Sequence, residues 1–139
     1  GLAIAFVHHD WTVAIGVVLA TGLKLVTERV IRKEMAGHLA VRQRPGTSQV
    51  GAILRGDVPG SGPSFPSGHV ILVAAIGTVV APNLAAIWWW LPVVLMLLVA
   101  GGRVYVGAHL PLDVVGGAAL GVVAGTAVHL GVRPRAAVT

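Results

Sequence analysis

The sequence predicts an all-α protein, a polytopic bundle of about four membrane-spanning helices. Of its 139 residues, 55% are hydrophobic and only 11% are charged, and 19 are glycine. The mean hydropathy is +0.85. Such a composition is typical of membrane proteins. Composition does not change abruptly along the chain, so we predict a single domain over residues 1–139.

The first spanning helix is predicted over residues 11–31. Its first half is apolar, and its second half carries charges from Lys24 onward, as expected where a helix emerges into a basic interface. Lys24 and Glu28 are four residues apart, so we expect an ion pair on one helix face. A loop is expected over residues 46–66, where glycine and proline recur too often for a long helix, with one short turn at 50–54.

Three further helices are predicted after this loop. Residues 69–81 and 84–100 are uninterrupted apolar segments joined by a turn at Pro82 and Asn83, which indicates a tight hairpin. Residues 110–132 form the last helix, and its many small residues permit close contact with another helix in lipid. These small residues are Gly116, Gly117, Ala118, Gly121 and Gly125.

The charge balance indicates the kind of partner. The formal net charge is +5, and the basic residues lie beside apolar segments, not among aromatic residues on a polar scaffold. This favours anionic lipid or phosphate as the partner over nucleic acid. The chain has no cysteine, which excludes disulfides and thiolate metal sites, and no carboxylate cage suited to a hard metal. We therefore predict neither a metal nor a cofactor.

Polar residues that can do chemistry gather in three short clusters. The clusters are Arg44-Pro45, residues 66–69 and residues 103–113. They fall at the end of the first predicted helix, the start of the second, and the turn between the third and the fourth. All three therefore lie on one side of the membrane. Charge that is buried or next to the membrane is unfavourable, so it usually marks a functional site. These clusters therefore predict one functional site, and the loop between the first two helices is predicted to be catalytic.

The side chains in these clusters match phosphoryl transfer. His109 and Asp113 are four residues apart at the start of a helix, so the carboxylate can accept a hydrogen bond from one imidazole nitrogen and leave the other as a nucleophile. Ser67 is the expected N-cap of the second helix, and Gly68 allows close approach to its free N–H groups, which favour an anion. His69 follows, placed to protonate a leaving oxygen.

Two arginines are expected to hold the phosphate. Arg44 and Arg103 present forked donors that match phosphate oxygens. Elsewhere a lone arginine at a helix end is more often an interface anchor, and a lone histidine is more often a hydrogen-bonded structural residue. The shared membrane side of the three clusters favours the functional interpretation for these residues.

The three clusters together resemble the motifs of the type 2 phosphatidic acid phosphatase (PAP2) superfamily, KxxxxxxRP, PSGH and SRxxxxxHxxxD. The second motif is complete at residues 66–69. The third is matched at Arg103, His109 and Asp113, with Gly102 at its serine position. The first keeps Arg44-Pro45, with Gly37 at its lysine position, and either Lys33 or Arg42 is a candidate to replace that charge. The resemblance covers most of the chain.

The resemblance implies a metal-independent mechanism. In it His109 attacks phosphorus, Asp113 orients and stabilises His109, and His69 protonates the leaving group, after which water hydrolyses a phosphohistidine. Arg44, Arg103, Ser67 and the Gly68 N–H would hold the nonbridging oxygens. Family members commonly have six spanning helices, so the resemblance also implies that two N-terminal helices are absent here. The chain is then a fragment, or it packs against another domain, subunit or copy.

The sequence leaves three classes of function open. The first is an integral-membrane phosphatase acting on a lipid phosphate or a polyprenyl (isoprenoid) diphosphate. The second is a lipid phosphotransferase that passes the phosphoryl group to an acceptor other than water. The third is a catalytically weakened module that binds lipid phosphate or serves assembly, which Gly37 and Gly102 favour. We expect a bacterial plasma membrane protein whose site faces outward, as in many bacterial relatives, although the positive-inside rule favours the cytoplasmic face.

Overall fold

The computed structural model describes residues 2–38 and 42–132 and confirms the all-α prediction. Within these residues, the only strand-like pairing is an isolated bridge between Gln43 and Pro63. The elements in chain order are α1 (Leu2–His38), α2 (Pro45–Ser48), α3 (Gly68–Val80), the 3₁₀ turns η1 (Ala81–Asn83) and η2 (Ala86–Trp88), α4 (Leu91–Tyr105) and α5 (Pro111–Val132).

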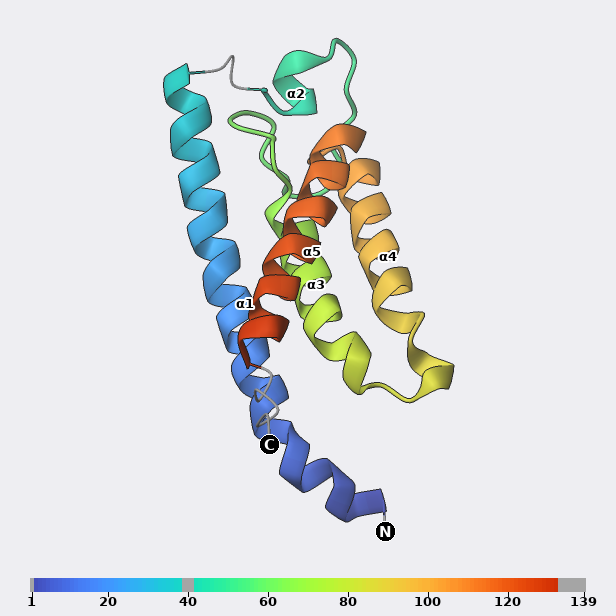
Figure 1. Ribbon diagram of the computed structural model, residues 1–139. Helices are drawn as coiled ribbons and strands as arrows, with labels where there is room; N and C mark the ends of the chain where they lie inside the picture. The colour runs from blue at the N-terminus through green and yellow to red at the C-terminus, as the bar shows by residue number, and fades with distance from the viewer. Residues whose placement is uncertain (1, 39–41, 133–139) are drawn as a thin grey trace.

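Helix α3 lies at the centre of the bundle, with α1, α4 and α5 packed around it (Figure 1). It is short because Ser67 precedes it as N-cap and η1 follows it directly. Its sequence is apolar throughout, and Val70, Ile71 and Ala75 are completely buried. An apolar helix surrounded by other helices is the arrangement that buries most of its surface. The helix that begins with the PSGH motif is therefore also the core of the fold.

The closest helix contact is between α3 and α5, as the small residues of α5 predicted. Gly117, Gly121 and Gly125 are buried and share one face of α5 at a spacing of four residues. A Cβ atom on each of these glycines would lie 2.5–2.8 Å from a backbone carbonyl oxygen of α3 or of its N-cap residue, namely those of Ile71, Ala75 and Ser67. Only glycine permits this approach, which is a recurring way to pack helices in lipid.

Two of the predicted helices have different bounds in the structure. The first helix was expected over 11–31 and extends over Leu2–His38. The third was expected over 84–100, whereas α4 covers Leu91–Tyr105, so Gly101 and Gly102 lie inside it. The short turn expected at 50–54 is present at Val50 and Gly51, where the Ala52 N–H donates to the Gln49 carbonyl at 3.3 Å. The short helix α2 at Pro45–Ser48 was not expected, and a proline at its first position favours helix initiation. The bounds of α3 and α5 agree with the prediction to within a residue.

Two helical segments are long and apolar enough to cross a membrane. They are Ala86–Tyr105, which joins η2 and α4, and α5 at Pro111–Val132. Gly68–Asn83 is apolar but shorter, and α1 is long but carries Lys24 and Glu28 in its second half. About four spans were predicted, and two of the described segments meet the criteria of length and composition. Large apolar side chains are exposed along α4 and α5, as is expected of surfaces that face lipid.

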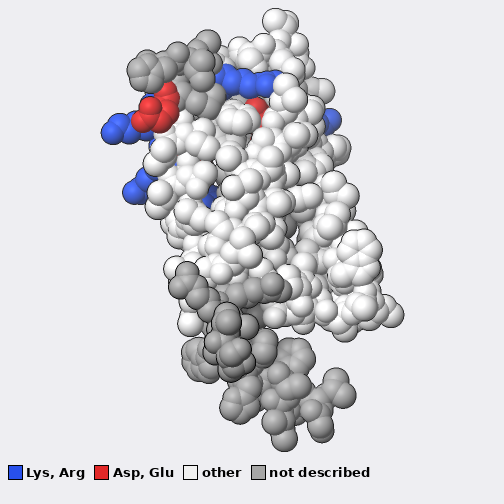
Figure 2. Space-filling view, viewed as in Figure 1, with Lys and Arg blue, Asp and Glu red and all other residues white. Residues whose placement is uncertain are grey.

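The three polar clusters lie at one end of the bundle, as predicted. This end carries the end of α1, all of α2, the start of α3, the end of α4 and the start of α5 (Figure 1). On the face drawn in Figure 2, charged side chains occupy this end, and the described surface toward the other end is uncharged. The fold therefore separates a polar end from an apolar body.

The packing of α5 on α3 leads to a test with two glycines in helices. We predict that Gly121→Ala destabilises the fold by about 1–3 kcal/mol, because overpacking forces the helices apart. Gly101→Ala in α4 is the matched control, since a Cβ there would meet no atom within 4 Å. Thermal unfolding in detergent micelles, followed by circular dichroism, measures both. Equal midpoints for the two variants would contradict this account of the helix contact.

Candidate active site

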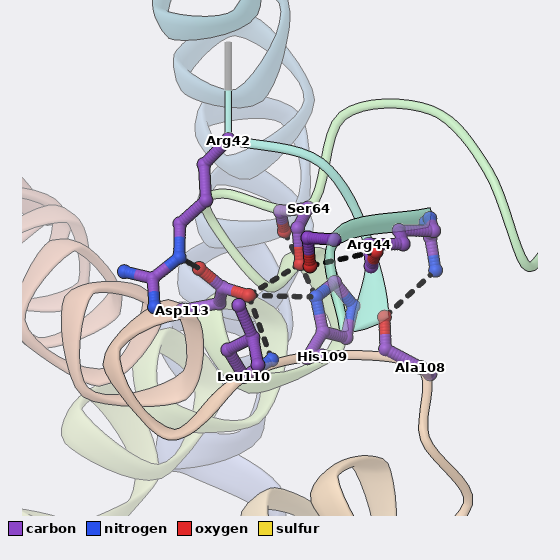
Figure 3. A network of polar contacts seen from close by, with 8 residues as sticks. Arg42, Arg44, Ser64, Ala108, His109, Leu110 and Asp113 are labelled. Atoms are coloured by element: carbon purple, nitrogen blue, oxygen red, sulfur yellow. Dashed lines mark hydrogen bonds and ion pairs between the residues drawn. The ribbon is translucent and has the colours of Figure 1, made fainter. Parts of the chain in front are cut away.

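The carboxylate of Asp113 is the fixed point of the polar end. Leu110 precedes α5 and Pro111 begins it, so Asp113 is the third residue of the helix and its side chain turns back to accept a hydrogen bond from the Leu110 N–H at 2.8 Å. This is the acidic half of a capping box, and the negative charge also suits the helix N-terminus. The Ser64 hydroxyl donates to the same oxygen (Figure 3). The whole side chain is buried.

The other oxygen of this carboxylate faces Arg42. The Arg42 Nε atom lies 3.5 Å from Asp113 Oδ1, which is an ion-pair distance without the geometry of a hydrogen bond. The Asp113 backbone carbonyl also accepts a hydrogen bond from the Ser67 N–H at 3.1 Å. Asp113 thus joins the loop after α1, the start of α3 and the start of α5.

His109 is held by a different partner from the one the sequence predicted. Its Nδ1 atom donates to the backbone carbonyl of Ser64 at 2.9 Å, whereas the nearest Asp113 oxygen lies 4.0 Å away. The predicted hydrogen bond to Asp113 is therefore wrong, because the Ser64 hydroxyl and the Leu110 N–H occupy that carboxylate oxygen. The contact still serves the predicted purpose: it fixes the ring tautomer and leaves Nε2 with a free lone pair.

The surroundings of His109 keep its imidazole neutral. The side chain is almost completely buried, and this desolvation is the main reason why its pKa falls from 6.5 to about 4. The positive charge of Arg44 lowers the pKa further, with a smaller contribution from Arg103, while the Ser64 carbonyl and Asp113 oppose the shift. A neutral imidazole is the form that can act as a nucleophile, and it is maintained here at neutral pH.

The two predicted phosphate-binding arginines both lie beside His109. The Arg44 Nη1 atom donates to the Ala108 carbonyl at 3.0 Å, which fixes this guanidinium next to the histidine. Arg103 is in the last turn of α4, and its backbone carbonyl accepts hydrogen bonds from the Ala108 and His109 N–H groups. The structure therefore brings Arg44, Arg103 and His109 together, as the motifs implied.

Two buried donors at this site have no hydrogen-bond partner among the described residues. They are the hydroxyl of Ser67 and the Nε atom of Arg103. Ser67 occupies the predicted N-cap position of α3, but its side chain makes no capping hydrogen bond. An unsatisfied buried donor is unfavourable by about 1–3 kcal/mol, so each of these groups is expected to bind a water molecule, an ion or a ligand. Both donors suit the oxygens of a phosphate.

Gly68 and His69 are the first two residues of α3. The side chain of His69 is exposed, unlike that of His109. Gly68 is buried against α1, where a Cβ atom would lie 2.6 Å from an oxygen of Glu28. Glu28 forms the predicted ion pair with Lys24, with their charged atoms 2.7 Å apart, so this pair lies next to the PSGH motif.

Lys33 and Arg42 are the two candidates to supply the charge of the motif lysine, and the structure places them differently. Helix α1 continues through Gly37 to His38. Lys33 is exposed on α1, and within the described residues no polar contact joins it to the site. Arg42 contacts Asp113 as described above, so it is the candidate that the structure brings to the site. Gly102, at the motif's serine position, is exposed, and a Cβ there would meet no atom within 4 Å.

Sequence reasoning missed Ser64, which contacts both His109 and Asp113. Its hydroxyl and its carbonyl act on different residues, both more than 40 positions later in the chain. The only signal in the sequence is its position three residues before Ser67, in a segment rich in proline and serine. Among the described residues, no group of three or more His, Asp or Glu side chains is arranged to hold a metal ion.

The fold and the site together define a class of protein. It is an apolar helical bundle that carries, at one end, two arginines beside a buried, neutral histidine. The sequence profile of the PAP2 superfamily matches residues 11–136, and the chain belongs to this superfamily. The crystal structure of LpxE from Aquifex aeolicus is similar in fold, with a TM-score of 0.75 and 24% sequence identity over 91% of this chain and 72% of that chain. The comparison with curated protein sequences gives no match.

The environment of His109 leads to a test by titration. We predict that its imidazole titrates near pH 4, with the midpoint raised in Arg44→Met, because that change removes a positive charge beside the ring. The unfolded chain takes up the same proton near pH 6.5, so His109 lowers folding stability as the pH falls from 6.5 toward 4. Imidazole NMR shifts in micelles, assigned with His109→Gln, measure the midpoint. A value near 6.5 would contradict the buried, cation-flanked position.

Proposed function

We propose that this protein is an integral-membrane phosphatase that hydrolyses a lipid phosphate or an isoprenoid diphosphate through a phosphohistidine on His109. The observation that carries the proposal is the pair of buried, unpartnered donors, Ser67 Oγ and Arg103 Nε, at the same end as a neutral histidine. Membership of the PAP2 superfamily supports phosphatase chemistry. The apolar segments of spanning length support a lipid substrate.

The nucleophile in this proposal is the Nε2 atom of His109. The Ser64 carbonyl holds the proton on Nδ1, so the Nε2 lone pair can attack phosphorus. As the nitrogen–phosphorus bond forms, positive charge develops on the ring. The Asp113 carboxylate, 4.0 Å away, stabilises this charge without a direct hydrogen bond. Asp113 therefore acts as an electrostatic partner and as the anchor of the Ser64 segment.

The leaving group departs with a proton from His69. As the bond from phosphorus to the ester oxygen breaks, His69 protonates that oxygen, and its exposed position lets it take up a new proton from water. Water then attacks the phosphohistidine and releases phosphate and free His109. Arg44, Arg103, the Ser67 hydroxyl and the Gly68 N–H bind the nonbridging oxygens during both steps. Arg42, paired with Asp113, takes the place of the motif lysine at the edge of this site.

The division of roles between the two histidines gives a direct test of this mechanism. We predict that His109→Ala loses at least about a thousandfold in turnover with every substrate, because it removes the nucleophile. His69→Ala should lose about a hundredfold or more with an alkyl lipid phosphate, and far less with p-nitrophenyl phosphate, whose leaving group needs no proton. Steady-state phosphate release measures both variants. Equal losses of His69→Ala on the two substrates would contradict its role as the acid.

Phosphate release also separates the proposal from its alternatives. A phosphotransferase would release less phosphate when an alcohol acceptor is added and would form the phosphorylated acceptor instead. A binding module would bind lipid phosphate without releasing inorganic phosphate from it.

We predict phosphate release that continues in EDTA and is inhibited by vanadate, since the proposed donors are arginines, a serine and backbone N–H groups. A strict requirement for Mg²⁺ would contradict the proposed site.

A further inference from the structure

The loop that follows α2 exposes apolar side chains at the polar end of the bundle. Val50 is fully exposed, and Ile53 is 66% exposed. Leu54 is also exposed, and so is Tyr105 at the end of α4. Exposed apolar residues of this kind in a loop are unfavourable in water when they are grouped. Ile53 and Tyr105 line the same pocket as His109, so this part of the polar end suits a partner that is itself apolar.

This loop is fixed to the C-terminal end of α4. The Arg55 N–H donates to the Val106 carbonyl at 3.1 Å, and its Nη1 atom donates to the Tyr105 carbonyl at 2.8 Å. The guanidinium also lies over the Tyr105 ring, 4.5 Å from its centroid. A cation at these free carbonyl groups stabilises the end of a helix. The loop therefore keeps a defined position relative to α4.

Gly107 allows the loop to come this close. Its φ angle is +76°, in the region that favours glycine, and a Cβ there would lie 2.7 Å from the Ile53 carbonyl oxygen. The backbone at Ile53 is thus in contact with the turn between α4 and α5. The apolar side chain at this position is held at the end of a helix that is itself long enough to span a membrane.

The exposed side chains of the loop continue the lipid-facing surface of α4. Val94, Leu98 and Tyr105 are all exposed, and their spacings of four and seven residues place them on one face of the helix. Tyr105 is the last residue of that face, and Arg55 packs on it. Tyrosine and arginine are typical of the level at which a spanning helix meets the lipid head groups.

We propose that Val50, Ile53, Leu54, Arg55 and Tyr105 form an interfacial lip that inserts into the head-group region of the bilayer. The apolar side chains of the lip contact the upper acyl chains, and Arg55 faces the lipid phosphates. The partner is the bilayer itself, because the lip is continuous with the apolar surface of a spanning segment. This inference rests on the membrane placement in the proposed function.

The lip fixes the depth of the active site in the bilayer. Ile53, Arg55 and Tyr105 line a pocket of about 350 Å³ whose wall also includes His109. A lip at the level of the head groups therefore places His109 at that level as well. The phosphate of a lipid substrate can then reach the nucleophile while its chains stay in the membrane.

Spin labels attached to single cysteines test the depth of the lip. The chain has no cysteine, so each label reports one position. The test site is Ile53→Cys, with Val50→Cys as a second site whose fully exposed side chain contributes no packing to the fold. Leu98→Cys in α4 is the lipid control, and Asp57→Cys, an exposed polar position in the same loop region, is the water control. All variants are measured as full chains in phosphatidylglycerol-containing vesicles, with helix content checked by circular dichroism.

The measured quantity is the ratio of collision with oxygen, which enters lipid, to collision with a water-soluble nickel chelate. We expect the ratio at Ile53 and Val50 to be severalfold higher than at Asp57 and to approach that at Leu98. Ratios at both lip positions equal to that at Asp57, with Leu98 in lipid, would overturn the lip and leave the membrane placement intact. A water-exposed Leu98 would overturn the membrane placement and the lip together.

Discussion

The buried carboxylate of Asp113 is the interaction on which the polar end of this protein depends. A carboxylate removed from water is unfavourable by several kcal/mol unless donors surround it. Here two donors and one positive charge come from three parts of the chain: the Leu110 N–H at the start of α5, the Ser64 hydroxyl before α3, and the Arg42 guanidinium, which makes an ion pair, after α1. One buried charge thereby fixes the segments that carry the rest of the site. Asp113 acts on His109 indirectly: it holds Ser64, and the Ser64 carbonyl accepts the hydrogen bond from the imidazole.

The glycine contacts between α3 and α5 make this arrangement possible. The glycine contact nearest the polar end is that of Gly117, one helical turn after Asp113, with the Ser67 carbonyl. The Ser67 N–H in turn donates to the Asp113 carbonyl. Close packing of two backbones in an apolar body therefore sets the position of the PSGH motif relative to Asp113 and His109. Because lipid offers no hydrophobic gain for helix association, such close contacts carry the packing energy. The same feature stabilises the fold and assembles the site.

The parts of the protein that local sequence determines could be predicted, and the parts that depend on distant backbone groups could not. The bounds of α3 and α5, their close contact and the gathering of the motifs at one end all follow from spacing and composition. The end of α4 was misplaced, because Gly101 and Gly102 do not end a helix whose backbone groups must bond to each other in an apolar environment. The partner of His109 was misassigned because a backbone carbonyl, such as that of Ser64, leaves no mark in the sequence.

The central claim is that the tautomer fixed by Ser64 makes His109 the nucleophile. Rapid mixing of the full chain with a lipid phosphate, a base quench that preserves phosphohistidine, and peptide mass spectrometry would locate the covalent phosphoryl group. We expect a single phosphorylated peptide containing His109, formed within one turnover and lost on exposure to acid. A phosphoryl group on His69, or hydrolysis with no covalent intermediate at any residue, would contradict it.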